Sequence, residues 1–354
     1  MMLVGIGGCT ALLLTGFGLR DTIINVADFQ YGEVTVFDLQ VYFSGGQDAS
    51  AQQTIVDELQ EDVEDILFYH QQSMDLEAHG TTREIFLMSA DSHVNNFVNF
   101  HSGDTPLQAP GRGEALLTVG VAEAMGIHVG DTVILRNADL QMLEVTVSGI
   151  YDNYVYNYAI VHPDTVMDQW NEYPGDQMAM VKVADHQDVH EVSAKIANMT
   201  DVMNVSVSVD TADMVAGMMD ALDLVVVIVV VCAGALAAIV LYNLTNINIT
   251  ERLREIATIK VLGFTASETG AYVFKENLVL TFVGVVLGMP LGRWFLGFVV
   301  DRIRINMVWF QPNAKPMSYV LAAVITVVSA LIVDFIFYFK LDKINMAEAL
   351  KSVE

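Results

Sequence analysis

Residues 224–241 of the chain read LVVVIVVVCAGALAAIVL, and no charged side chain follows them until Glu251. A helix needs about 20 apolar residues to cross the ~30 Å hydrocarbon core of a bilayer, so this stretch predicts a membrane-spanning helix. Three more stretches have the same length and apolar character: residues 1–19, 277–300 and 317–339. The sequence therefore predicts an α-helical membrane protein with four transmembrane helices.

The charge of the chain lies almost wholly between the first and second of these stretches. The 354 residues have a net charge of −26, although 53% are hydrophobic and only 17% are charged. Residues 20–220 hold six Lys and Arg against 33 Asp and Glu, a net charge of −27, and the remainder has a net charge of +1. This pattern predicts an acidic soluble domain inserted into a nearly neutral membrane part. Such acidity argues against nucleic-acid binding and against a basic surface that binds anionic lipid.

Basic residues in the short connections predict the orientation. Seven lie between the second and third helices or after the fourth: Arg252, Arg254, Lys260, Lys275, Lys340, Lys343 and Lys351. Four lie on the opposite side: Arg20, Arg302, Arg304 and Lys315. The positive-inside rule then places the C-terminus in the cytoplasm and the acidic domain outside a plasma membrane.

The acidic domain is predicted to be mixed α+β. Period-two alternation and short apolar runs predict strands at residues 32–43, 74–78, 84–88, 132–136, 143–151, 159–162, 179–183 and 205–209. Amphipathic spacing predicts helices over 49–67 and 187–198, the second completing a βαβ-like unit. Gly and Pro residues predict a long loop over 103–113.

No enzymatic motif is found. The sequence has no phosphate-binding P-loop, no G-x-S-x-G nucleophile elbow and no H-E-x-x-H helix. His186 and His190 have metal-ligand spacing, and the acidic face within 57–65 could gather divalent cations; a solvated helix face is the preferred interpretation of both. Cys9 and Cys232 both fall in predicted spans, so no disulfide framework is expected. We expect no catalytic, cofactor or metal site in this chain.

The most informative segment follows the second predicted helix. Residues 246–264 read NINITERLREIATIKVLGF, in which Thr250 is a plausible N-cap and Gly263 a plausible end. The short helix between them would expose four charged side chains: Glu251, Arg252, Glu255 and Lys260. Such a helix either lies on the inner membrane surface or docks into a partner protein and passes on its motion.

This segment resembles the FtsX-like and MacB-like permeases of ABC transporters. The resemblance continues through residues 275–277 (KEN), 284–292 (GVVLGMPLG) and the tail 342–350 (DKINMAEAL). Weaker similarity covers residues 121–133 (VAEAMGIHVGDTV) and 145–151 (VTVSGIY) of the acidic domain.

The resemblance implies a permease subunit with residues 1–19 as its first helix, 20–220 as a MacB-like extracytoplasmic domain and 221–354 as an FtsX-like domain. It implies that a separate ATPase subunit binds ATP and contacts the coupling residues Glu251, Arg252, Glu255, Lys260 and Gly263. The implied function is export or extraction of an amphiphilic lipid, lipoprotein or peptide. Two alternatives stay open: regulation of an extracellular cell-wall hydrolase, and an antibiotic-sensing complex without transport.

Two further features concern the membrane part. Gly284, Gly288 and Gly292 form overlapping GxxxG units, which allow close approach of a neighbouring helix in the same subunit or across a dimer; packing within the subunit is preferred. The basic segment that such permeases carry before the first helix is missing, which suggests a truncated start. The chain is then expected to pair either with itself or with a second permease unit, within membrane lipid.

Overall fold

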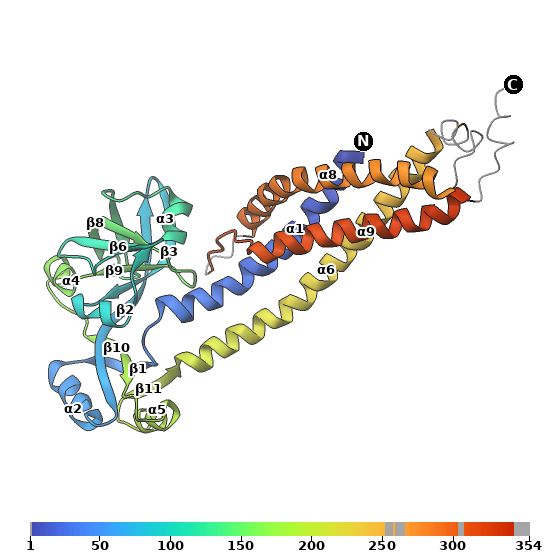
Figure 1. The fold of residues 1–354 in the computed structure, drawn as a ribbon. Helices are drawn as coiled ribbons and strands as arrows, with labels where there is room; N and C mark the ends of the chain where they lie inside the picture. Colours follow the sequence, from blue (N-terminus) through green and yellow to red (C-terminus); the bar gives the residue numbers. More distant parts are fainter. Residues whose placement is uncertain (1, 252–257, 259–265, 304–307, 343–354) are drawn as a thin grey trace. The chain divides into compact units, whose positions relative to one another are not determined.

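The computed structural model describes residues 2–251, 258, 266–303 and 308–342. The chain divides into two compact units. The apolar-helix unit contains Met1–Ile23, Met219–Ile303 and Gln311–Glu354. The α+β unit contains Ile24–Met218 together with Arg304–Phe310. Figure 1 shows the helices and strands of both units.

Four long helices are long and apolar enough to cross a membrane within the described part of the chain. They are α1 (Met2–Phe29), α6 (Ser208–Glu251), α8 (Ala266–Arg302) and α9 (Pro316–Asp342). These helices contain the four predicted stretches, and each extends beyond its apolar part. Apolarity indicates which residues can face lipid, whereas backbone hydrogen bonds continue a helix through polar residues until a terminating signal.

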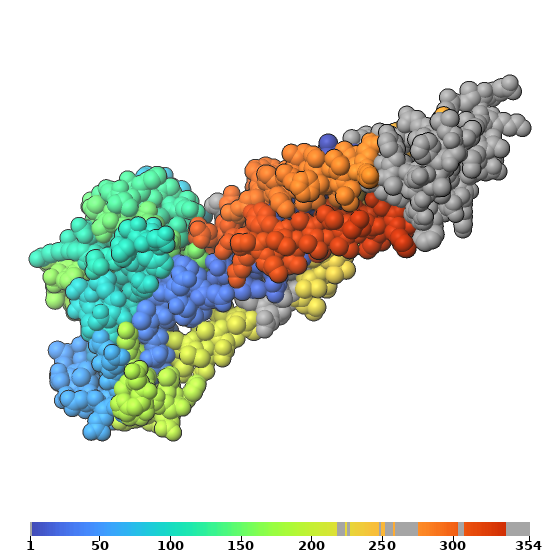
Figure 2. Space-filling view, in the orientation of Figure 1, coloured from blue at the N-terminus to red at the C-terminus, as the bar shows by residue number. Residues whose placement is uncertain are grey.

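Helix α1 is the central helix of the apolar-helix unit. Its most apolar window is 56% buried, compared with 33% for those of α8 and α9. A β-carbon added at Gly5 or Gly16 would contact α6, whereas one added at Gly7 would lie 3.3 Å from the backbone of α8. The Thr10 hydroxyl lies 3.2 Å from that of Thr326 on α9. Helices α8 and α9 also pack against each other, and their side chains lie side by side in Figure 2.

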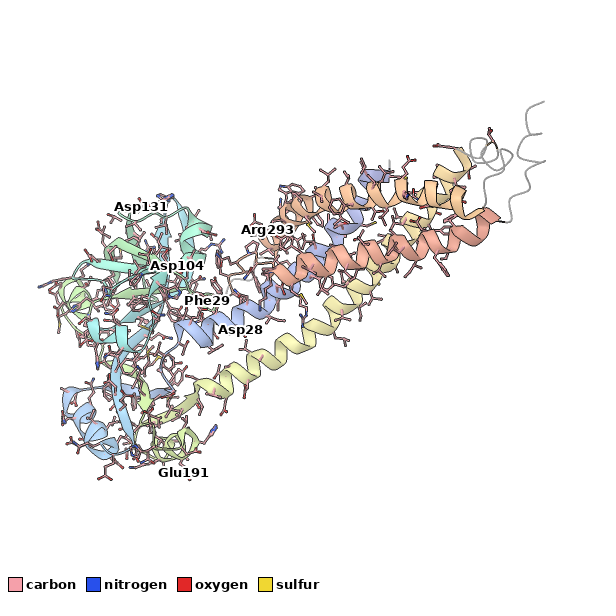
Figure 3. All side chains as sticks on the ribbon, viewed as in Figure 1. Asp28, Phe29, Asp104, Asp131, Glu191 and Arg293 are labelled. Carbon is pink, nitrogen blue, oxygen red and sulfur yellow. The ribbon has the colours of Figure 1, made fainter. Side chains whose placement is uncertain are left out.

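The two charged residues within predicted spans differ in their surroundings. Arg293 lies on the exposed surface of α8 (Figure 3). Asp334 of α9 is only 8% exposed, and its Oδ1 accepts a hydrogen bond of 3.0 Å from Nδ2 of Asn277 on α8. A carboxylate in an apolar unit is costly unless it has a hydrogen-bonding partner, so this pair ties α8 to α9.

The α+β unit is built on a nine-stranded sheet in the order β11-β1-β10-β2-β3-β9-β6-β8-β7. Its strands are β1 (Leu39–Gln47), β2 (Val63–Ala78), β3 (Thr81–Ser89), β6 (Glu114–Thr118), β7 (Thr132–Arg136), β8 (Met142–Tyr151), β9 (Tyr158–Val161), β10 (Asp176–Val183) and β11 (Val202–Val207). A separate hairpin joins β4 (His101–Ser102) and β5 (Thr105–Pro106). The helices are α2 (Ala49–Leu59), α3 (Val119–Met125), α4 (Pro163–Trp170) and α5 (Val189–Ala197).

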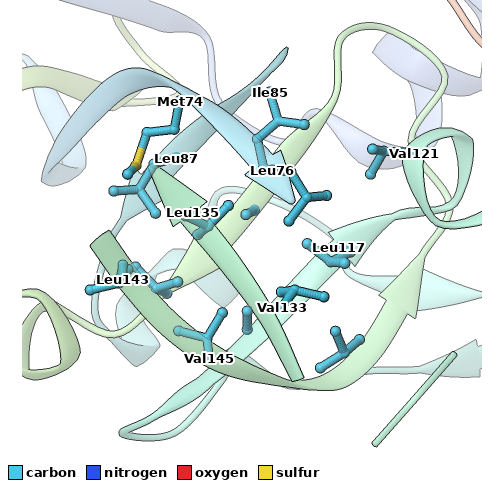
Figure 4. Close-up of a cluster of buried hydrophobic side chains, with 14 of the residues drawn as sticks. Met74, Leu76, Ile85, Leu87, Leu117, Val121, Val133, Leu135, Leu143 and Val145 are labelled. Atoms are coloured by element: carbon cyan, nitrogen blue, oxygen red, sulfur yellow. The ribbon is translucent and has the colours of Figure 1, made fainter. Parts of the chain in front are cut away.

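The sheet has two halves that share the long strand β2. The strands β11, β1, β10 and the first part of β2 are antiparallel neighbours, and α2 and α5 complete a β-α-β-β-α-β arrangement. The second part of β2 pairs with both β3 and β7, which closes the strands β2-β3-β9-β6-β8-β7 into a small barrel. Alternate residues of the barrel strands point inward and fill it, among them Leu76, Leu135 and Val145 (Figure 4).

Several sequence-based expectations for this unit are confirmed, and others are wrong. The strand over 132–136 has the predicted bounds, whereas the helix expected over 49–67 ends at Leu59. Residues from Val63 onward instead form β2, because Val63, Ile66 and Leu67 pair with β10 and this pairing outweighs the local helical period. The strand expected from residue 32 begins at Leu39, since Gln30–Val34 form a π-helix.

Other differences are smaller. The expected loop over 103–113 contains β5 and the turn before β6. The βαβ-like unit exists with β1 inserted: β10 and β11 both run antiparallel to β1 and are therefore parallel to each other. Helices α3 and α4 were not expected, because each is only about two turns long, too short for a helical period to be recognised over several repeats.

Candidate functional site

The predicted ATPase-coupling segment lies almost entirely outside the described residues. Glu251 is the last residue of α6 and is exposed. Arg252, Glu255, Lys260 and Gly263 are not among the residues that the structure describes. The expected N-cap at Thr250 is wrong, because Thr250 lies within α6, where its hydroxyl donates to the Asn246 carbonyl oxygen at 2.7 Å. The rest of the coupling helix stays a prediction.

The three predicted packing glycines of α8 lie against α1. A β-carbon added at Gly284 would come within 2.7 Å of the Ile6 side chain, and one at Gly292 would come within 3.0 Å of the Ala11 backbone. At Gly288 it would come within 2.6 Å of the Gly7 carbonyl oxygen. Real β-carbons essentially never approach other atoms as closely as at Gly284 and Gly288, and the contacts at Gly292 would be unusually tight, so glycine permits this small separation of α1 and α8.

Helix α1 also holds the beginning of α9. Asp21 is 6% exposed, and its Oδ2 accepts hydrogen bonds from the Lys315 backbone N–H at 2.8 Å and the Ser318 hydroxyl at 2.5 Å. The Thr22 hydroxyl donates to the Asn313 carbonyl oxygen at 3.1 Å. A carboxylate at this position accepts from the backbone N–H just before α9 and from a hydroxyl in its first turn, and it interacts favourably with the helix dipole. Displacement of α9 at this end therefore acts directly on α1.

A second group of contacts holds the end of α1 inside the α+β unit. The Gln30 amide donates to Asn153 Oδ1 at 2.9 Å and accepts from the backbone N–H groups of Tyr154 and Val155 at 3.0 and 3.2 Å. The ring of Phe29, labelled in Figure 3, stacks on that of Tyr154 with 4.1 Å between centroids. Gln30 is only 8% exposed, so these hydrogen bonds are shielded from water. They fix the C-terminal end of α1 to residues 153–155.

The connection between α8 and α9 also contacts residues 154 and 155. Its residues Val308 and Trp309 belong to the α+β unit, where Val308 forms a β-bridge with Val155. The Trp309 backbone N–H donates to the Tyr154 carbonyl oxygen at 2.9 Å, and the two rings lie 5.3 Å apart.

The Trp309 side chain is further held by α3. Its Nε1 donates to Glu123 Oε2 at 3.3 Å, and a β-carbon added at Gly120 would come within 3.0 Å of the tryptophan. Glycine at this position therefore lets the tryptophan pack directly on the backbone where α3 begins.

We call Phe29, Gln30, Asn153, Tyr154 and Trp309 the Tyr154 cluster. Tyr154 is 3% exposed, and burial, followed by the nearby carboxylates of Asp152 and Glu33, raises the pKa of its hydroxyl, which stays protonated. The cluster joins chain segments that enter the α+β unit from α1 and from the α8–α9 connection. No sequence motif marks the Tyr154 cluster. Its one visible sign in the sequence is Trp309, a tryptophan in the short connection between two apolar stretches.

The weaker metal-site candidates are not assembled into a site. His190 Nδ1 lies 3.7 Å from Asp210 Oδ2, and the described residues contain no group of three His, Cys, Asp or Glu side chains placed to hold a metal ion. On the acidic face near α2, Asp62 Oδ2 accepts from Lys195 Nζ at 2.5 Å, and Asp65 Oδ2 lies 2.8 Å from His93 Nε2. These acidic side chains therefore contact basic or histidine partners.

Comparison with solved structures finds similar extracytoplasmic domains. The periplasmic region of MacB from Actinobacillus actinomycetemcomitans is 10% identical and covers 52% of this chain and 94% of its own, with a TM-score of 0.35. The extracellular domain of the noncanonic ABC-type transporter YknZ from Gram-positive bacteria is 13% identical and covers 48% and 100%, with a TM-score of 0.34. A domain of a putative permease protein from Porphyromonas gingivalis is 16% identical and covers 46% and 79%, with a TM-score of 0.28.

Comparison with protein families identifies the chain. Comparison with curated proteins finds no match. The family model of the MacB-like periplasmic core domain matches residues 2–199, and that of the FtsX-like permease C-terminal domain matches residues 226–346. The chain therefore belongs to the MacB/FtsX-like family of ABC transporter permeases, membrane proteins with a periplasmic domain that work with a cytoplasmic ABC ATPase.

Proposed function

We propose that this permease transmits the ATP-driven motion of its ATPase to the extracytoplasmic domain and thereby exports or extracts an amphiphilic substrate, such as a lipid, lipoprotein or peptide. The chain itself performs no catalysis. Its C-terminus and the segment around Glu255 are cytoplasmic and contact the ATPase, and the permease acts as a dimer or with a second permease unit.

The observation that carries this proposal is the Tyr154 cluster. Three chain connections lead from the apolar helices into the α+β unit: the end of α1, the beginning of α6 and the α8–α9 connection. Two of these connections meet at Tyr154, whose ring lies 4.1 Å from that of Phe29 and 5.3 Å from that of Trp309. A displacement of α1 relative to α8 and α9 would therefore strain one small, well-packed group of side chains. Such an arrangement suits a transmitter of motion.

The first experiment tests transmission in the full chain, purified with its ATPase and reconstituted in nanodiscs. Hydrogen exchange of residues 153–158 is followed by mass spectrometry with and without ATP. We expect ATP to change exchange in the wild type, and Trp309→Leu to abolish that change while ATP hydrolysis continues. Trp170→Leu is the matched control, because Trp170 belongs to α4 and not to the cluster. An unchanged ATP response in Trp309→Leu would contradict transmission through the cluster.

The second experiment tests export. Proteoliposomes that contain the permease and its ATPase are loaded with a fluorescent phospholipid, a lipopeptide or an apolar peptide, and transfer to an acceptor is measured. ATP-dependent transfer of one of these supports export or extraction. If ATP alters hydrogen exchange in the extracytoplasmic domain but none of the three probes is transferred, transport is refuted, and the hydrolase-regulating or sensing function becomes the better explanation.

A further inference from the structure

A cavity of about 370 Å³ lies within the α+β unit. It occupies the face of the sheet opposite α2 and α5, because Gln40, Tyr42 and Met180 line it while their neighbours Val41 and Val181 pack in the core beneath those helices. The π-helix after α1 and the first turns of α6 complete its wall. Its volume is about two and a half times that of the ~150 Å³ cavity that accepts one benzene molecule, which is room for a single short apolar chain.

The cavity wall is uncharged in a strongly acidic domain. Five tyrosines line it: Tyr31, Tyr42, Tyr151, Tyr156 and Tyr158. None of the described residues that line it is Asp, Glu, Lys, Arg or His. An ionised ligand group buried here would lose its hydration without gaining an opposite charge. A carboxylate would also meet repulsion from a surrounding domain of net charge −27.

The tyrosine hydroxyls come together in this cavity. Tyr42 donates to Gln40 Oε1 at 3.2 Å, and Gln40 Nε2 donates to the Tyr69 hydroxyl oxygen at 2.6 Å. Burial raises the pKa of Tyr158, and the proximity of Tyr42 and Tyr156 raises it further. The Tyr158 hydroxyl therefore stays protonated and can donate a hydrogen bond, for which a ligand carbonyl oxygen is a suitable acceptor.

Tyr156 is held in a strained backbone conformation at this wall. Its φ angle is +61°, in the left-handed region that bulky residues rarely adopt. The Asn153 amide donates to the carbonyl oxygens of Val155 and Tyr156 at 2.7 and 3.1 Å and thereby keeps this conformation. The Tyr156 ring packs edge-on against Phe86 and Tyr158. Strain that is maintained by neighbouring side chains is typical of ligand-binding positions.

We propose that this cavity binds the single apolar chain of an uncharged amphiphile, whose amide or ester carbonyl oxygen accepts hydrogen bonds from the tyrosine hydroxyls. Aromatic and methionine side chains provide an adaptable apolar wall, and the hydroxyls orient the polar end. This binding rests on the cavity alone and needs neither ATP nor transport. Its failure is therefore distinguishable from failure of the proposed export.

The test is photolabelling of the full chain in nanodiscs, without ATPase or ATP. The probe is a decanamide that carries a diazirine on its alkyl chain; the decanoate and decylammonium analogues differ only in charge. We expect adducts of the amide on cavity residues, mapped by mass spectrometry, and at least tenfold less labelling there by decanoate. Absence of adducts in the cavity, or equal labelling by either charged analogue, would overturn the proposal.

Variants separate binding from folding. Tyr158→Phe removes one hydroxyl and keeps the ring, so labelling should fall about fivefold, the equivalent of one ~1 kcal/mol hydrogen bond. Val215→Trp adds bulk from the partly exposed surface of α6 and should abolish labelling. Tyr173→Phe is the control, because Tyr173 donates to Asp176 outside the cavity. If thermal unfolding of the three variants agrees but Val215→Trp labels like the wild type, the amide does not occupy this cavity.

Discussion

The contact between α1 and α8 gives the sharpest structural prediction. In Gly288→Ala, the new β-carbon would lie 2.6 Å from the Gly7 carbonyl oxygen and 2.8 Å from the Thr10 β-carbon. Atoms in favourable contact lie about 3.5–4.0 Å apart. One of the close atoms belongs to the backbone and the other is a β-carbon, so no change of rotamer relieves the overlap. The two helices must therefore separate by about 1 Å at this point.

The cost of that separation can be set against a control on the same helix. Overpacking of this kind costs about 1–3 kcal/mol. No atom of the described residues lies within 4 Å of a β-carbon added at Gly297, so Gly297→Ala should gain up to about 1 kcal/mol of helix propensity. Both substitutions gain the helix propensity of alanine, so the two variants should differ by the overpacking cost of about 1–3 kcal/mol, or about 2–6 °C in melting temperature. Gly292→Ala should be intermediate, because its closest contacts are at 3.0 Å.

The assay is thermal unfolding of the full chain in detergent, followed by intrinsic tryptophan fluorescence and by the loss of the monodisperse peak in size-exclusion chromatography. We expect Gly288→Ala to unfold at the lowest temperature and Gly297→Ala at the highest. If Gly288→Ala and Gly297→Ala melt within about 1 °C of each other, α8 does not approach α1 through this glycine, and the inferred packing is wrong.

Three further predictions use the same unfolding measurement. Asn277→Leu should cost about 1–3 kcal/mol, because it leaves the buried Asp334 without its amide hydrogen bond. The double change to leucine at both positions should restore most of that stability, and a double variant as unstable as the single one would count against this reasoning. Leu135→Ala in the filled barrel should cost about 2–5 kcal/mol, whereas Val129→Ala at an exposed position should change stability by about 0.5 kcal/mol or less. Equal effects of the two changes would refute the barrel core. Asp21→Ala should cost about 1–2 kcal/mol by freeing the start of α9, and Asp21→Asn should recover part of that loss. If Asp21→Ala unfolds at the wild-type temperature, Asp21 does not stabilise the start of α9.

Much of the fold could be predicted because its determinants are local. Long apolar stretches with at most one charged residue each located the four long helices, and alternation located β7 within its observed bounds. The helix predicted over 49–67 failed for a physical reason. Ile55, Leu59 and Val63 continue a helical period, but Val63 pairs with Val183 on β10, a strand distant in the sequence. Local periodicity cannot register such a partner, because the pairing depends on the completed sheet.

For the candidate sites, too, local patterns could be predicted from the sequence, whereas contacts between distant residues could not. The GxxxG pattern of α8 was visible in the sequence, but the identity of its partner helix was not. Gln30, Tyr154 and Trp309 form one cluster although more than 120 residues separate each from the next along the chain. The tyrosine cavity likewise combines residues from β1, β8, β9 and α6. No spacing rule connects such residues, because their proximity arises from the sheet order.

The junction of β11 and α6 has a mechanical consequence of its own. Strand β11 ends at Val207 and α6 begins at Ser208, so no linker residue absorbs rotation between them. Strand β11 is also an edge strand, hydrogen-bonded within the sheet to β1 alone. A turn of α6 about its own axis is therefore applied as a torque to the outermost ladder of the sheet. That ladder would open one hydrogen bond after another from its Val207 end, so a rotation is converted into a graded release instead of a rigid displacement.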